Sequence, residues 1–187
     1  MTISIIYKGV NYLENKKQIA NYIVSFDTFM LQPVNKGNKI ATRVIERNGE
    51  LSVPRKPIHI VKKSCDYYGG SLQNSMNTAK LTLGKHHKPP IIVAHDFGIP
   101  YIFLPTMSPT SEQNIWVSYR AIDNIEPTDM GCIIYLENNR SFKVNISAAT
   151  MYRQYTFASI LEKNFLKKQK QLNRPSPFGN FNHFEDE

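Results

Sequence analysis

The chain has 187 residues, 41% hydrophobic and 11% aromatic, a composition typical of a folded protein with one sizeable core. Its 23 lysines and arginines outnumber 15 aspartates and glutamates, which gives a formal net charge of +8. Two cysteines exclude a disulfide framework. Because no uninterrupted apolar run approaches about 18 residues, we expect a cytoplasmic protein that does not cross a membrane.

The first third of the chain predicts short strands separated by turns. Residues 22–24, 28–31 and 39–47 are rich in β-branched and aromatic side chains. Lys36-Gly37-Asn38 and Asn48-Gly49 are turn signals beside these segments. We therefore expect the chain to begin its sheet here.

The next segment predicts one short helix and then a loop. Ile58, Val61 and Cys65 recur at spacings of three and four after Pro57, a residue suited to the first turn of a helix. Paired glycines at 69–70 predict the end of this helix. Residues 71–88 are polar apart from Leu81–Leu83, and we expect a loop there.

The second half of the chain predicts further strands. Residues 91–93 and 101–104 are two brief strands separated by a turn that contains Asp96 and Gly98. Residues 115–125 alternate apolar and polar, as one half-buried strand would. Residues 132–136 and 141–146 predict a β-hairpin.

A long helix is predicted after Ser147, a residue suited to an N-cap. Its apolar stripe is formed by Met151, Tyr155, Ala158, Leu161 and Phe165. Pro175 and Pro177 end it, and we expect residues 173–187 to be a flexible aromatic and acidic tail. The sum is an α+β fold over residues 1–172: a strand-rich single domain with short internal helices and a long C-terminal helix. Cys65 and Cys132 are expected to be small buried side chains.

Basic residues gather between positions 55 and 95, against a single acid, Asp66. They are Arg55, Lys56, Lys62, Lys63, Lys80, Lys85 and Lys88. Four of the five histidines and the pair Tyr67-Tyr68 lie in the same segment. Cations beside aromatic side chains suit contact with phosphates and bases. A solvated basic loop with inward-packed tyrosines is the alternative, and charge alone does not separate the two.

Sequence signatures of enzymes are missing: the chain has no GxxxxGK[ST], GxSxG or HExxH motif. Its carboxylates are too scattered to indicate a magnesium-dependent nuclease. His86, His87 and His95 could ligate a metal, but Lys85 and Lys88 would repel a cation, so a rigid basic loop is the preferred interpretation. We expect no catalysis, no metal and no cofactor.

Four sequence blocks occur in a specific order: KPIHIVKKSCDYYGGS (56–71), KHHKPPIIV (85–93), IFLPTMSPT (102–110) and WVSYRAI (116–122). Together they resemble the competence transcription factor ComK family of low-GC Gram-positive bacteria. The resemblance implies a transcriptional activator of genes for DNA uptake and recombination. It also implies that the protein binds AT-rich promoter boxes as a homo-oligomer, largely through the minor groove, and that a proteolytic adaptor controls it. RNA polymerase is a further expected partner.

The matching blocks also suggest which residues contact DNA. These candidates are Lys62, Lys63, Tyr68, Lys85, His87, Lys88 and Arg120. A narrow A-tract minor groove attracts inserted cationic side chains, which favours a basic loop such as 85–88 as one contact. The alternative is an RNA- or single-strand-binding module that stacks bases on Tyr67, Tyr68 and Tyr119.

Overall fold

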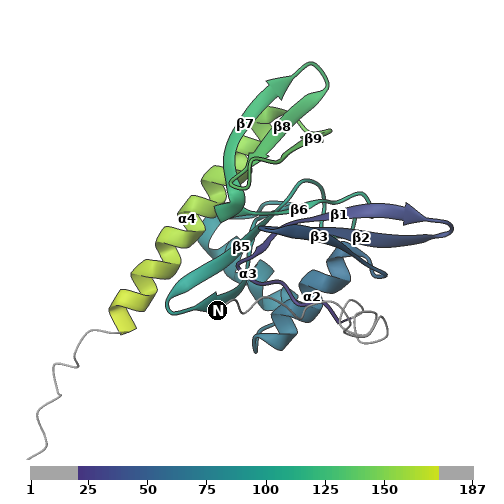
Figure 1. Cartoon of the computed structure of the whole chain (residues 1–187). Helices are drawn as coiled ribbons and strands as arrows, with labels where there is room; N and C mark the ends of the chain where they lie inside the picture. Colours follow the sequence, from purple (N-terminus) through teal and green to yellow (C-terminus); the bar gives the residue numbers. More distant parts are fainter. Residues whose placement is uncertain (1–20, 173–187) are drawn as a thin grey trace, which may run out of the picture.

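The computed structural model describes residues 21–172 and forms an α+β fold, as predicted (Figure 1). The predicted tail, 173–187, lies outside the described residues. The helices are α2 (Pro57–Tyr67), α3 (Leu72–Leu83) and the long α4 (Ala148–Leu172). The strands are β1 (Thr28–Lys36), β2 (Lys39–Glu46), β3 (Gly49–Val53), β4 (Ile91–Asp96), β5 (Ile99–Pro105), β6 (Trp116–Ser118), β7 (Ile122–Thr128), β8 (Gly131–Leu136) and β9 (Ser141–Val144).

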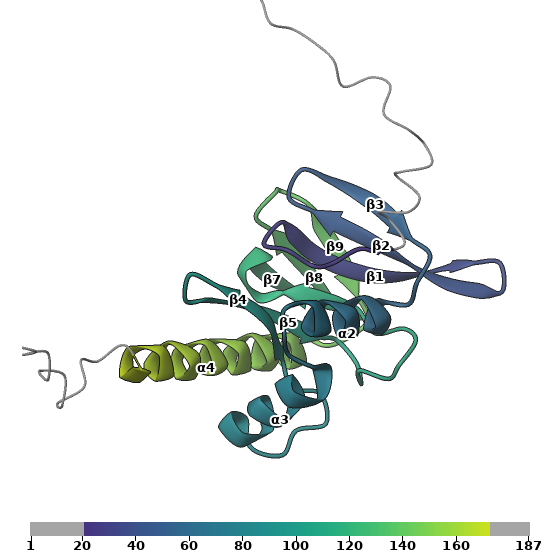
Figure 2. The same ribbon diagram turned by 90° about the horizontal axis from the view of Figure 1, so that it is seen from below.

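The strands form two antiparallel sheets. The larger sheet has six strands in the order β3-β2-β1-β6-β5-β4, and the smaller has three in the order β7-β8-β9. Figure 2 shows α2 over the six-stranded sheet, with the three-stranded sheet behind it. Helix α4 runs from the smaller sheet along β5, as both views show.

Alternate residues of the six-stranded sheet point into two separate cores, because successive side chains of a strand face opposite sides. The residues that face α2 are Leu31, Val44, Phe103 and Trp116. Their sequence neighbours Met30, Ile45, Leu104 and Val117 pack instead with the smaller sheet and α4. The two cysteines are buried in different cores, Cys65 with α2 and Cys132 with α4, as small apolar side chains.

Helix α3 contradicts the loop predicted after residue 71. Ser71 caps the helix by accepting a hydrogen bond from the backbone N–H of Asn74 at 3.1 Å, and Gly84 ends it at φ 88°. Ala79 is its single fully buried residue. Leu72, Met76, Ala79 and Leu83 form an apolar stripe at spacings of four, three and four, which the polar composition of the segment obscured in the sequence.

Two strand predictions also need correction. Residues 115–125 do not form one strand: β6 pairs with β1 and β5, a 3₁₀ turn follows at Tyr119–Ala121, and β7 then pairs with β8 in the other sheet. Residues 22–24 are not a strand, because the N–H of Val24 donates to the Ser64 hydroxyl on α2 at 3.0 Å. The hairpin predicted at 132–146 is confirmed as β8 and β9.

Helix α4 begins as predicted. The Ser147 hydroxyl accepts a hydrogen bond from the N–H of Thr150 at 3.3 Å. In the predicted stripe, Met151, Ala158 and Leu161 are buried, and Tyr155 and Phe165 are half-buried. Gln154 extends the buried face, and its amide donates to the carbonyl of Lys88 at 2.8 Å. Helix α4 therefore holds the loop that precedes β4.

Candidate nucleic-acid interface

The outer face of α2 carries two of the predicted contact residues. Ile60, Val61, Ser64 and Cys65 point into the core, which leaves His59 and Lys62, one turn apart, exposed on the opposite face. The half-buried Lys63 donates to the side-chain oxygen of Asn21 at 2.5 Å. Lys62 is therefore the more accessible cation of this pair.

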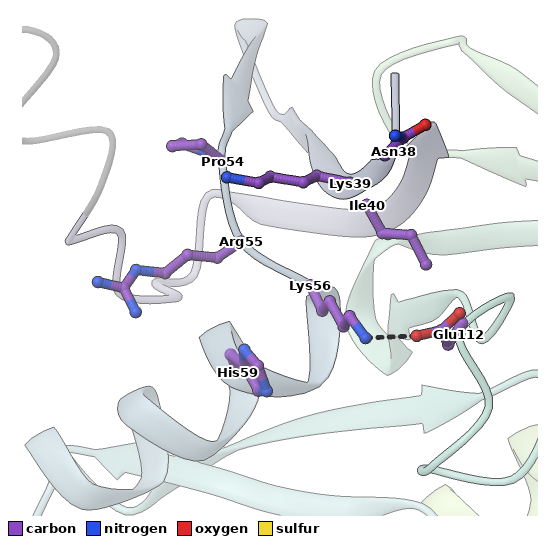
Figure 3. A pocket seen from close by; sticks show the side chains of 8 residues that line it. All are labelled: Asn38, Lys39, Ile40, Pro54, Arg55, Lys56, His59 and Glu112. Carbon is purple, nitrogen blue, oxygen red and sulfur yellow. Dashed lines mark hydrogen bonds and ion pairs between the residues drawn. The ribbon is translucent and has the colours of Figure 1, made fainter. Parts of the chain in front are cut away.

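A cationic cleft of about 460 Å³ opens at the first turn of α2, between this helix and the ends of β2 and β3. Its lining residues are Asn38, Lys39, Ile40, Pro54, Arg55, Lys56, His59 and Glu112, all shown in Figure 3. Lys56 forms an ion pair with Glu112 across the cleft, and Lys39, Arg55 and His59 also line it.

The backbone adds to the positive potential of this cleft. The first turn of α2 contains no acidic residue, and no side chain caps its N-terminus. The helix dipole places partial positive charge at a helix N-terminus, which favours a neighbouring anion. The cleft and the exposed face of α2 share His59, so they form one continuous surface, which we call the α2 surface: Lys39, Arg55, Lys56, His59 and Lys62.

The predicted contacts of loop 84–90 are of two kinds. Lys85 and His87 are exposed. Lys88 is half-buried, and its ammonium donates to the carbonyl of Thr106 at 3.0 Å. Desolvation, with a smaller contribution from the nearby charge of Arg153, lowers the pKa of Lys88. Lys88 thus ties the loop to the end of β5, while Lys85 and His87 face solvent.

His86 and His95 pack against different residues of helix α4. The ring of His86 packs on Phe157 at 4.4 Å between centroids, and its Nε2 lies 3.0 Å from the Leu83 carbonyl oxygen. His95 packs on Phe165 at 5.4 Å. Within residues 21–172, no group of three His, Cys, Asp or Glu residues could hold a metal ion.

The side chains of Tyr68 and Arg120 each form a hydrogen bond with another part of the fold. The Tyr68 hydroxyl donates to the Val24 carbonyl at 2.8 Å, and desolvation is the main cause that raises the pKa of this phenol. Arg120 donates to Glu162 of α4 at 2.6 Å, so its charge is compensated within the fold. The predicted contacts therefore lie in three places: on α2, in loop 84–90, and beside α4.

Sequence reasoning missed Lys39 and did not select Arg55, Lys56 or His59 as contacts. The last three lie inside the basic segment 55–95, so local charge density could have indicated them. Lys39 is remote in sequence and follows a turn, and pairing of β2 with β3 brings it to the cleft. No helix of the described part of the chain is long and apolar enough to cross a membrane.

The fold and its charge define a basic α+β domain with exposed cationic side chains on α2, on loop 84–90 and on the C-terminal half of α4. Residues 19–170 match the ComK protein family, and the chain belongs to this family. Among curated proteins, it is 26% identical over 148 residues to the competence transcription factor of Bacillus subtilis (strain 168), covering 79% of this chain and 76% of that protein. No solved structure matches the chain.

Proposed function

We propose that this protein is a sequence-selective, double-stranded-DNA-binding activator of competence genes. Membership of the ComK family and the similarity to a competence transcription factor support a regulator of transcription. In this proposal the protein is cytoplasmic, catalyses no reaction and acts as a homo-oligomer. RNA polymerase and a proteolytic adaptor are its further proposed partners.

The α2 surface is the single observation that carries this proposal. Lys39, Arg55, Lys56 and His59 line the cleft together with Glu112, which is paired with Lys56, and Lys62 follows one turn further along the exposed face of α2. An α-helix the length of α2, 11 residues, spans about 16 Å, the rise of roughly five base pairs. A cationic surface of this length suits the phosphates of a duplex.

Loop 84–90 supplies the proposed groove contacts. A minor groove about 6 Å wide is too narrow for a helix, but it accepts single side chains. Lys85 and His87 are exposed on a loop that Lys88 and Gln154 hold in place. The narrow groove of A/T runs has the most negative potential, so side chains of this kind favour AT-rich boxes.

One observation favours the single-strand alternative. Tyr67 is 69% exposed at the end of α2, beside Lys63, and an exposed phenol can stack on an unpaired base. Stacking of this kind would not require a duplex. The nucleic-acid preference of the protein separates the two functions.

The first test is a fluorescence-anisotropy titration of the full chain at near-physiological salt. The ligands are a duplex with phased A and T runs, a GC-rich duplex, and a single strand of equal length, each with and without magnesium. We expect the A/T duplex to bind at least about tenfold more tightly, or about 1.4 kcal/mol, and to remain uncleaved. Tighter binding of the single strand would support the alternative, and equal binding of all three would contradict sequence selection.

The second test locates the interface. We expect Lys62→Ala to weaken binding of the A/T duplex and to reduce the slope of log affinity against log salt by about 0.9, because one phosphate contact is lost. Lys143→Ala is the matched control, since it removes an exposed lysine from β9 of the smaller sheet. Lys88→Ala should change the slope less than Lys62→Ala, because the ammonium of Lys88 is bound to Thr106. An unchanged slope for Lys62→Ala would remove α2 from the interface.

A further inference from the structure

The hairpin of β4 and β5 presents a phenylalanine at its tip. Asp96 pairs with Ile99 across a two-residue turn, Phe97-Gly98. The side chain of Phe97 is 98% exposed, and Ile99 beside it is 38% exposed. Among the large hydrophobic residues in the described part of the chain, Phe97 is the most exposed.

The turn itself does not require a phenylalanine. Phe97 has φ 45° and Gly98 has φ 78°, so both central residues adopt the left-handed region, as type I′ turns demand. Asn-Gly and Gly-Gly suit such turns, whereas a bulky residue at positive φ is strained. Neither burial nor turn geometry therefore accounts for the aromatic side chain at this position.

A basic helix end lies beside this tip. Hairpin β4–β5 runs along the C-terminal half of α4 in both views (Figures 1 and 2), and the ring of His95 packs on Phe165 of α4. Residues 163–172 of α4 contain no acid, and their four lysines are exposed: Lys163, Lys167, Lys168 and Lys170. Asp96 is the acidic residue beside the turn at the hairpin tip. As the neighbour of His95 in the strand, it faces the other side of the hairpin, towards Tyr68 and Tyr101.

We propose that Phe97 is an apolar wedge that enters the minor groove of an A/T duplex and partly unstacks one base step. This inference rests on the proposed binding of duplex DNA and adds a specific contact to it. Minor-groove proteins insert apolar side chains in this way, and pyrimidine–purine steps such as TA unstack most easily. The lysines of α4 bind phosphates beside the inserted ring.

The test uses the full chain and an A/T duplex with 2-aminopurine beside a central TA step, because fluorescence of this base rises when it unstacks. We expect the wild-type protein to raise the fluorescence at saturation. Phe97→Ala should abolish the rise and weaken binding by about tenfold. Phe97→Leu should keep much of the rise, because it retains an apolar wedge.

Two controls separate the wedge from other effects. Leu81→Ala removes a side chain that is 88% exposed on α3, and it should change neither fluorescence nor affinity. The double variant Lys167→Gln, Lys168→Gln should reduce the salt slope by about 1.8, with the fluorescence rise retained at saturation.

The outcomes distinguish this inference from the proposed function. If the wild type binds the A/T duplex without a rise in fluorescence, or if Phe97→Ala behaves as the wild type, the wedge is overturned and DNA binding stands. If the wild type does not prefer the A/T duplex, both proposals fail. The wedge is supported if the rise in fluorescence is lost in Phe97→Ala but is kept in Phe97→Leu and in Leu81→Ala.

Discussion

At the scale of single residues, the same side chain has different roles according to its surroundings. Lys62 lies on the open face of α2, where its ammonium is accessible to phosphate. Lys88 is half-buried and bound to the Thr106 carbonyl, and its lowered pKa reflects desolvation. The sequence presents both as lysines of one basic segment. Their difference comes from the strands and helices that surround each of them.

Phe97 provides a prediction at this scale. We expect Phe97→Asn to raise the free energy of unfolding by about 1 kcal/mol, because asparagine tolerates positive φ and the exposed ring contributes little packing. Urea denaturation of the full chain measures this change.

Phe97→Ala is the control for backbone strain, since alanine at φ 45° is strained as well and should give a smaller gain. A loss of stability in Phe97→Asn would mean that the ring packs within the fold. A gain in stability together with weaker DNA binding would fit a residue retained for function.

At the scale of elements, α3 shows how a mostly polar segment can form a helix. Its start depends on the Ser71 cap, and its surface carries a hydrogen bond from Gln73 to Asn77 at 2.9 Å. Its end at Gly84 determines where loop 84–90 begins. The cap of α3 therefore affects the position of Lys85 and His87.

We expect Ser71→Ala to lower the free energy of unfolding by about 1 kcal/mol, because the N–H of Asn74 loses its acceptor. Urea denaturation followed by circular dichroism measures the loss. Thr78→Ala is a matched control at an exposed interior position of the same helix, where alanine has the higher helix propensity and should not destabilise. Equal stability of Ser71→Ala and the wild type would contradict a stabilising cap.

At the scale of the whole molecule, the turn of the smaller sheet docks on the larger one. The Glu50 carboxylate accepts hydrogen bonds from Arg43 of β2 at 2.7 Å and from Arg140 of the β8–β9 turn at 2.6 Å. The amide of Asn138 donates to the carbonyls of Glu46 and Arg47, both at 3.2 Å. These contacts join segments about ninety residues apart in sequence.

The Glu50 bridge predicts a pH dependence. The two arginine hydrogen bonds lower the pKa of Glu50 from its ordinary value of 4.5. The charged form is therefore favoured in the folded state, and its contribution to stability is present above pH 4.5 and is lost as pH falls through the lowered pKa. We expect Glu50→Gln to reduce Tm at neutral pH, and the difference from the wild type to shrink in acid.

Calorimetry at a series of pH values measures this difference. Asp123→Asn is the control, because it removes an exposed carboxylate from β7. A difference in Tm that does not change with pH would contradict the bridge. The exposure of Glu50 makes a small effect the expectation, since solvent screens ion pairs of this kind.

Local patterns were sufficient to predict most elements and the family. Short apolar segments beside turn residues identified β4, β5 and the β8–β9 hairpin. A capped apolar stripe identified α4, since the helical periodicity is set by the backbone alone. The four sequence blocks identified the ComK family, which the family comparison confirms. The charge surplus indicated an anionic partner, and the DNA contacts remain predictions.

Only the tertiary structure decided which of these strands, helices and side chains lie together in space. The alternation of residues 115–125 could not reveal that β6 and β7 belong to different sheets, because strand pairing is non-local. Pairing of β2 with β3 brings Lys39 to the first turn of α2 and so completes the cationic cleft. Lys88 and Arg120 bond to other groups of the fold, whereas Phe97 is exposed at a hairpin tip. Residue type and spacing are local properties, whereas accessibility depends on every element that packs nearby.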